Sequence, residues 1–320
     1  MPETPPIIDA VVIGRNEGAR LVTCLASLQG HVRHIIYVDS GSSDNSADAA
    51  RAAGAEVVEL DMSHPFTAAR ARNAGLARLN EADFVQFVDG DCRVDAGWIA
   101  FAARHLASHS KLAVVCGRRR ELYPQASIYN RLCDIEWDTP VGLAPACGGD
   151  AMMRVTALDQ VNGFREDLIA GEEPELCLRL RREGWSIERL DHEMTKHDAN
   201  ILRFGQWWAR SRRAGHAFAE GAHLHGRAPE RHWRRETRRA LFWGLGLPIA
   251  ALALFASASF GAGVLALMLY PAQVLRLTLK TNDHQLAAFN VLGKFPEALG
   301  VVQFHRNRMF GRKSAIVEYK

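Results

Sequence analysis

Hydrophobic residues in the N-terminal part of the chain occur in short runs that alternate with stretches of helical spacing. Four runs predict buried strands, at 7–13, 35–38, 57–60 and 84–88, because they are short, apolar and rich in β-branched or aromatic residues. The segments between them predict helices at 16–28, 44–54 and 68–79. Strands that alternate with helices are typical of an open, mostly parallel sheet with right-handed crossovers. The chain is therefore expected to begin with an α/β domain.

The hydrophobic pattern that follows position 90 is less regular. It predicts strands at 113–117 and 187–190, and a glycine-interrupted strand at 146–153. Helices are expected at 174–183, where Pro174 suits the first turn, and at 204–218.

A stretch of 36 residues, 240–275, contains no charged side chain. One straight helix of that length would reach about 54 Å, well beyond a hydrocarbon core of about 30 Å. Two helices, at about 240–257 and 261–277, would each just cross such a core. The pattern therefore predicts a membrane-associated helical hairpin within 231–280.

The charges beside this stretch agree with a hairpin. Arginines precede it and Arg276 and Lys280 follow it, whereas the expected outer turn is uncharged, as the positive-inside rule requires. A buried helical pair of a soluble protein is one alternative. Pro248 and Pro271 also leave open an arrangement that lies in the membrane without crossing it.

Composition and charge exclude only a few classes of protein. A net charge of +3 is too mild to argue for nucleic-acid binding, although 227–239 is densely basic. The six cysteines form no C-x-x-C pair, so neither a zinc site nor a compact disulfide framework is expected. The N-terminus has no signal-peptide pattern, so we expect the first domain in the cytoplasm, at the inner face of the membrane. No G-x-G-x-x-G follows the first strand, so a dinucleotide dehydrogenase is disfavoured.

Polar residues follow three of the predicted strands, at 15–17, 39–44 and 89–91. The carboxyl ends of parallel strands meet at one edge of a sheet, where ligands of such folds bind. Asp89 and Asp91 stand one residue apart and can reach one hard cation together. Oxygen ligands suit Mg²⁺ or Mn²⁺. The sequence therefore predicts a divalent-cation site at this edge.

Seven short motifs in order resemble those of the inverting glycosyltransferases of family 2, whose nucleotide-diphospho-sugar-binding fold is called GT-A. The resemblance covers roughly residues 7–215. The motifs are Ile13-Gly-Arg-Asn-Glu17, Val38-Asp-Ser-Gly-Ser-Ser-Asp44, Ala71-Arg-Asn-Ala-Gly75, Val88-Asp-Gly-Asp91, Cys147-Gly-Gly-Asp150, Val161-Asn-Gly-Phe164 and Gly171-Glu-Glu173 with Arg179. The resemblance implies a Rossmann-like, mostly parallel sheet flanked by helices.

The resemblance also implies donor-binding roles. Asp39 would hydrogen-bond the nucleobase, Arg72 would lie near the base or the diphosphate, and His197 would lie near the diphosphate. Asp89 would meet the ribose or a metal-bound water, while Asp91 would ligate the cation. The remaining donor-site residues implied by the motifs are Ile13, Arg15, Asn16, Glu17 and Ser42, with Gly148, Gly149 and Asp150 lining the donor sugar.

Glu173 matches the general base of the family, with Glu172 as its neighbouring alternative. A base would take the proton of the acceptor hydroxyl as the oxygen attacks the anomeric carbon, and such a single displacement inverts that centre. A cation would stabilise the charge of the departing nucleoside diphosphate. Gln206 and Arg210 resemble a later Q-x-x-R-W motif, and we expect them near the acceptor or the diphosphate.

The match of that last motif is imperfect, because Trp207 and Trp208 lie inside it rather than after it. Tryptophans at such positions serve either as apolar anchors or as platforms for a sugar.

We therefore expect a GT-A catalytic domain at 1–230, a membrane-associated hairpin at 231–280 and a basic cytoplasmic tail at 281–320. The expected enzyme is a metal-dependent, inverting hexosyltransferase. It would move a sugar from a UDP- or GDP-sugar to a hydroxyl of a membrane-associated acceptor, in envelope, exopolysaccharide or glycolipid assembly. A polyprenyl-phosphate sugar synthase and a non-catalytic nucleotide-sugar-binding module are the alternatives; no nucleic-acid partner is expected.

Overall fold

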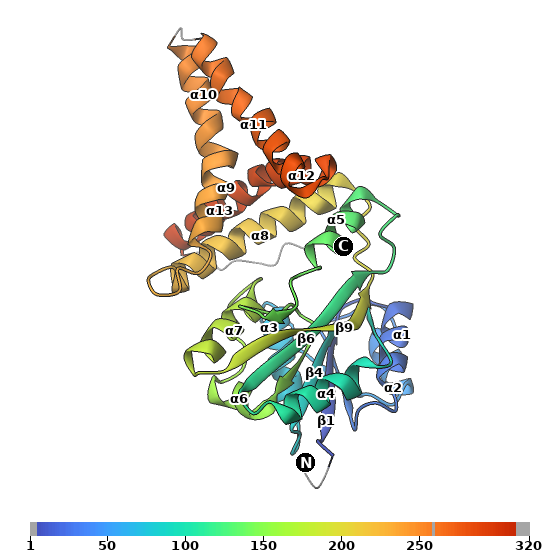
Figure 1. Ribbon diagram of the computed structural model, residues 1–320. Helices are drawn as coiled ribbons and strands as arrows, with labels where there is room; N and C mark the ends of the chain where they lie inside the picture. Colours follow the sequence, from blue (N-terminus) through green and yellow to red (C-terminus); the bar gives the residue numbers. More distant parts are fainter. Residues whose placement is uncertain (1–4, 258–259, 312–320) are drawn as a thin grey trace. The chain divides into compact units, whose positions relative to one another are not determined.

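The computed structural model of the chain describes residues 5–257 and 260–311. The chain divides into two compact units, Met1–Leu202 and Arg203–Lys320. The first unit is α/β and the second is helical among its described residues (Figure 1).

One mixed sheet forms the centre of the first unit, in the order β3-β2-β1-β4-β8-β6-β9-β5, with β7 paired to β9. The strands from β3 to β4 are parallel, whereas β8 runs antiparallel to both β4 and β6. The strands are β1 (Ile8–Gly14), β2 (Ile35–Asp39), β3 (Glu56–Glu59), β4 (Phe84–Asp89), β5 (Cys92–Val94), β6 (Leu112–Glu121), β7 (Gly142–Leu143), β8 (Ala151–Arg154) and β9 (Ser186–His197). The expected mostly parallel α/β sheet is confirmed.

Helices flank this sheet (Figure 1). They are α1 (Ala19–Leu28), α2 (Ser46–Ala52), α3 (Ala68–Leu76), α4 (Trp98–Ser108), α5 (Ile128–Glu136), α6 (Val155–Gln160) and α7 (Glu172–Arg182). Residues of β1 and β4 are buried along nearly their whole length, as in parallel strands covered on both faces. α1 presents a fully buried apolar stripe that includes Leu21, Leu25 and Leu28.

Three boundaries differ from the expected ones for local reasons. α1 begins at Ala19 rather than at 16, because Asn16 and Gly18 have positive φ values of 57° and 52° that a helix does not allow. β8 begins at Ala151, so the expected strand residues 146–150 form a loop. β6 extends to Glu121, since its arginines form ion pairs that compensate their burial.

The second unit contains α8 (Phe204–His225), α9 (Arg234–Leu241), a π-helical turn η1 (Phe242–Gly246), α10 (Leu247–Ala256), α11 (Phe260–Thr281), α12 (His284–Leu292) and α13 (Lys294–Met309). The helical run Arg234–Ala256 and the helix Phe260–Thr281 have the length and composition of membrane-crossing helices. α10 and α11 lie against each other in opposite directions (Figure 1), which confirms the apolar hairpin. The expected turn at 257–263 includes residues 258–259, which lie outside the described ones.

α8 and α13 cross at very short backbone distance. A Cβ atom added to Gly215 would lie 2.0 Å from the carbonyl oxygen of Glu297, and one on Gly300 would lie 2.0 Å from that of Arg212. Only glycine fits at these two contacts. The segment after the hairpin, expected as a basic tail, is therefore helical as far as Met309 and folds back onto α8.

Candidate active site

Two loops at the carboxyl ends of β1 and β2 are joined by side-chain hydrogen bonds. The backbone amide of Asn16 donates to the hydroxyl of Ser42 at 2.9 Å. The side-chain oxygen of Asn16 accepts from the backbone amide of Ser43 at 2.7 Å. The carboxylate of Asp39 accepts hydrogen bonds from the backbone of Gly41 and Ser42, at 3.0 and 2.8 Å. These hydrogen bonds therefore hold the two loops in a defined shape.

The loop after β1 also contacts the loop that bears the two aspartates. The Gly90 amide donates to the carbonyl of Ile13 at 2.8 Å, which fixes Asp89 and Asp91 beside the end of β1. Glu17 pairs with Arg20 at 2.8 Å. The guanidinium of Arg15 stacks over Phe66 at 5.1 Å from the ring centre.

Arg72, on α3, joins three carboxylates. Its Nη2 lies 3.0 Å from Asp89 Oδ1, and its Nη1 lies 2.9 Å from one oxygen each of Glu172 and Glu173. The Arg72 side chain is buried, so these ion pairs operate with little screening by water. Arg72 therefore links the predicted cation site to the predicted base.

A second, half-buried arginine, Arg119 on β6, reaches the same aspartate from the other side. Its Nη2 lies 3.2 Å from Asp89 Oδ2 and its Nε lies 3.4 Å from Asp150 Oδ2. Its guanidinium also stacks over Trp137, 4.9 Å from the ring centre. Asp89 thus lies between two guanidinium groups, of Arg72 and Arg119.

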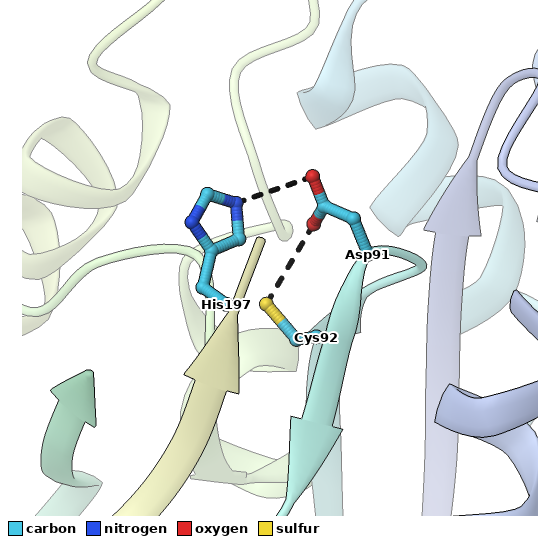
Figure 2. A group of neighbouring side chains, drawn as sticks. All are labelled: Asp91, Cys92 and His197. Atoms are coloured by element: carbon cyan, nitrogen blue, oxygen red, sulfur yellow. Dashed lines mark hydrogen bonds and ion pairs between the residues drawn. The ribbon is translucent and has the colours of Figure 1, made fainter. Parts of the chain in front are cut away.

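Asp91, Cys92 and His197 come together where β5 pairs with the end of β9 (Figure 2). Asp91 Oδ2 lies 3.2 Å from His197 Nε2, and the Cys92 thiol lies 3.7 Å from Asp91 Oδ1. Burial, together with the positive charge of Arg119, lowers the pKa of His197 to about 3. The imidazole is therefore neutral, and one of its two ring nitrogens carries a free lone pair.

The donor atoms at this edge fit a divalent cation. Asp91, Cys92 and His197 offer atoms within 4.8 Å of one another, and so do Asp89, Cys92 and Asp150. Carboxylate oxygens with a neutral imidazole form a donor set that suits Mn²⁺ or Mg²⁺. Burial raises the pKa of the Cys92 thiol, which keeps it protonated and a poor ligand.

Gly149 lies among the catalytic candidates and leaves no room for a side chain. A Cβ atom there would lie 2.5 Å from Arg72 Nη2, 3.0 Å from Asp89 Oδ2 and 3.2 Å from Glu173 Oε1. The neighbouring Gly148 is less crowded, since its nearest atom would be Arg119 Nη1 at 3.9 Å. Gly149 therefore lets the backbone approach the carboxylates closely.

Asp150 stabilises the loop that bears Asp89 and Asp91. Its Oδ1 accepts from the backbone amide of Asp89 at 3.1 Å, and its Oδ2 accepts from the Thr195 hydroxyl at 2.7 Å. A buried, bonded carboxylate of this kind holds its neighbours in a fixed geometry.

Glu173 lies in the first turn of α7, next to Glu172. Gly171, at φ 84°, turns the chain in the left-handed region just before the helix, so that both glutamates enter its first turn. Burial and the negative charge of Glu172 raise the pKa of Glu173 to about 7, although Arg72 acts in the opposite direction. The Glu173 side chain is 14% exposed against 6% for Glu172. Glu173 is therefore the more accessible carboxylate.

The structure brings together most, but not all, of the residues expected from the sequence. Asp89, Asp150, Arg72, Glu172, Glu173 and Gly149 form one cluster of contacts. The pair of Asp91 and His197 adjoins this cluster through Cys92, which contacts both Asp91 and Arg119. Gln206, Trp207, Trp208 and Arg210 lie on α8, in the second unit. There Trp207 is buried against Phe289 of α12, and Gln206 Oε1 accepts from the backbone of Arg203 at 3.0 Å. Their expected contact with acceptor or diphosphate stays a prediction.

Sequence reasoning missed Arg119, Trp137 and Thr195. The run Arg118-Arg119-Arg120 resembles an exposed basic patch, yet it lies on a strand, where neighbouring side chains point to opposite faces. The side chain of Arg119 therefore contacts Asp89, whereas that of Arg118 pairs with Asp134. Only the alternation of the strand offered a signal for this arrangement.

Comparison with known protein families identifies the family to which part of the first unit belongs. Residues 9–159 match the family model described as glycosyl transferase family 2. This segment belongs to that family, and the sheet of the first unit is that of its GT-A fold.

Two relatives show how far the similarity extends. A pre-mycofactocin glycosyltransferase of Mycobacterium tuberculosis is 26% identical over 216 residues, which are 63% of this chain and 45% of the relative. The chain thus spans about half the length of the curated relatives it matches. The mannosyltransferase PcManGT of Pyrobaculum calidifontis, solved with GDP-Man and Mn²⁺, has a TM-score of 0.65 and 19% identity, over 94% of this chain and 88% of that one. This structural likeness, across both units of the chain, is one of fold.

Proposed function

We propose that the first unit is a metal-dependent, inverting glycosyltransferase that moves a hexose from a UDP- or GDP-sugar to an acceptor hydroxyl. One observation carries the proposal: Arg72 joins the base candidate Glu173 to Asp89, and Gly149 lies against all three. A transferase needs a leaving-group site and a proton acceptor close together, and this cluster offers both. The family match and the fold of PcManGT support the same assignment.

Glu173 is the proposed general base. Its raised pKa, about 7, lies near the pH at which a base works best, because it is then both ionised and basic enough to accept a proton. Glu172 is more deeply buried and shares Arg72 with Glu173. Its proposed role is to raise the basicity of its neighbour.

Asp89 and Asp91 are the proposed cation ligands, with His197 beside Asp91. A bound Mn²⁺ or Mg²⁺ supplies the positive charge that stabilises a departing diphosphate. Arg72 and Arg119, which flank Asp89, are proposed to add positive charge beside the same leaving group. The loops of Asn16, Ser42 and Asp39 are proposed to hold the nucleoside.

The acceptor is proposed to be membrane-associated, such as a lipid-linked saccharide in envelope or exopolysaccharide assembly. The two apolar helices, Arg234–Ala256 and Phe260–Thr281, support attachment to a membrane, since their apolar side chains are largely exposed. We propose that the first unit lies on the cytoplasmic side, because arginines and Lys280 border the apolar stretch.

The test is hydrolysis of a panel of nucleotide-sugars by the detergent-purified chain, with Mn²⁺, with Mg²⁺ and with chelator. The proposal expects metal-dependent release of nucleoside diphosphate from one donor, lost in Asp91→Asn and kept in the exposed control Asp48→Asn. Once an acceptor is found, the anomeric configuration of the product by NMR tests inversion. Calorimetric titration that detects no nucleoside diphosphate bound in the presence of Mn²⁺ would refute the assignment.

A further inference from the structure

One side of α9 bears four arginines, Arg234, Arg235, Arg238 and Arg239, here called the arginine face. All four are exposed, and their spacing places them on neighbouring turns of one side of the helix. Among the residues that the structure describes, no carboxylate pairs with any of the four guanidinium groups.

The arginine face continues without a break into an apolar one. The side chains that follow on the same helical run are Phe242, Leu245, Ile249 and Leu252, exposed by 53, 37, 55 and 67%. Charged residues at the beginning of an exposed apolar helix lie where a membrane-crossing segment meets the lipid headgroups.

The returning helix places two more cations at the same end of the hairpin. Arg276 and Lys280 are exposed, one turn apart, near the end of α11. Because α10 and α11 run in opposite directions, the end of α11 lies at the same end of the hairpin as the beginning of the helical run (Figure 1). The open end of the hairpin is therefore bordered by six exposed cationic side chains.

This arrangement is unfavourable unless anions are present. Like charges four residues apart repel each other, as Arg234 and Arg238 do, and cations near the beginning of a helix oppose its dipole. The first turn of α9 contains one acidic residue, Glu236, against the two arginines Arg234 and Arg235. Phosphate groups beside the arginine face would offset both penalties, and guanidinium groups bind phosphate through paired hydrogen bonds.

We infer that the arginine face, with Arg276 and Lys280, binds the phosphate groups of anionic membrane lipids and so sets the depth of the hairpin in the bilayer. This inference rests on the proposed membrane attachment. The bound chemistry is a lipid headgroup with a phosphate diester and a net negative charge, because the cations adjoin exposed apolar side chains that a water-soluble phosphate would leave in water.

The experiment has two stages, so that failure of membrane attachment and failure of lipid recognition are distinguishable. First, the full chain is reconstituted into phosphatidylcholine vesicles, washed at alkaline pH and floated; loss of the chain from the vesicles overturns the membrane attachment itself. Second, the chain in neutral detergent is titrated with phosphatidylglycerol, and the concentration that gives half of the maximal thermal stabilisation is measured.

The wild type is expected to respond to phosphatidylglycerol and not to phosphatidylcholine. Each cation at an anionic surface adds roughly a fivefold gain in affinity. Replacing the four residues of the arginine face by Gln is therefore expected to raise the half-maximal concentration by about two to three orders of magnitude. The charge-matched control replaces the exposed residues Arg78, Arg93, Arg104 and Lys111 by Gln, and is expected to behave as the wild type.

Equal responses of the wild type and the arginine-face variant would overturn the inference. So would equal stabilisation by glycerol 3-phosphate, which has the phosphate without the lipid chains, because the site would then be one for soluble phosphate.

Discussion

The assignment of Glu173 as the base makes a quantitative prediction about pH. A carboxyl group of pKa about 7 is about one tenth ionised at pH 6 and about nine tenths ionised at pH 8. Since only the ionised form accepts a proton, kcat/KM should rise about tenfold between these two values and then level off. The pH interval of this rise lies well above the usual pKa range of glutamate, because burial and the negative charge of Glu172 disfavour the charged form of Glu173.

The substitution Glu173→Gln keeps the shape and removes the base. We expect kcat to fall by about 10²–10⁴, with the dependence on pH between 6 and 8 lost. Glu183→Gln, exposed at the end of the same helix, is the matched control and should keep wild-type activity.

Glu172→Gln separates the two glutamates. It removes a charge that raises the pKa of Glu173, so the variant should stay active with a profile shifted to lower pH. The assay is release of nucleoside diphosphate at saturating Mn²⁺ from pH 5.5 to 9, with either the acceptor or water as the nucleophile. A flat profile in the wild type, or Glu172→Gln as the more damaged variant, would refute the reasoning.

Other substitutions test the rest of the cluster. Gly149→Ala should reduce activity at least about tenfold, because the methyl group would need to displace an Arg72 guanidinium held by three carboxylates. Gly261→Ala, where an added Cβ meets no atom within 4 Å, is the control in the same donor-hydrolysis assay. Arg119→Gln should lower the melting temperature, because the buried carboxylate of Asp150 would lose its ion pair and Asp89 would keep only Arg72, while Arg119→Lys should fold and show a raised KM for the donor. The raised pKa of Glu173 means that its contribution to folding is fully present below pH 4.5 and is lost as the pH rises through about 7. The melting temperature of Glu173→Gln relative to wild type should therefore increase from pH 4.5 to 8 in differential scanning fluorimetry.

The fold was largely predictable because its strongest determinant is the alternation of short apolar runs with helical spacing. β1, β2 and β4 lie close to their expected positions, and their polar ends meet as the parallel arrangement requires. The loop before α1 was not predictable, because the positive φ of Asn16 depends on its contacts with Ser42 and Ser43. Such tertiary hydrogen bonds leave no periodic trace in the sequence.

The candidate site was predictable where motifs fix the residue and less so where packing does. Asp89, Asp91 and Glu173 follow from short sequence patterns, whereas Arg119 follows from the face of β6 on which it lies. The basic character of 281–320 as a whole did not predict α12 and α13, although α12 is largely apolar; both helices pack against other helices of the second unit.

Gly215 and Gly300 allow close packing between α8, which precedes the hairpin, and α13, which follows it. Because α8 precedes the hairpin and α13 follows it, the chain between them forms a loop whose two ends are held by helix packing as well as by the backbone itself. A cut at the hairpin tip would therefore leave both pieces associated. Two fragments that meet at the tip should reassemble when produced separately, so the second unit lends itself to fragment complementation.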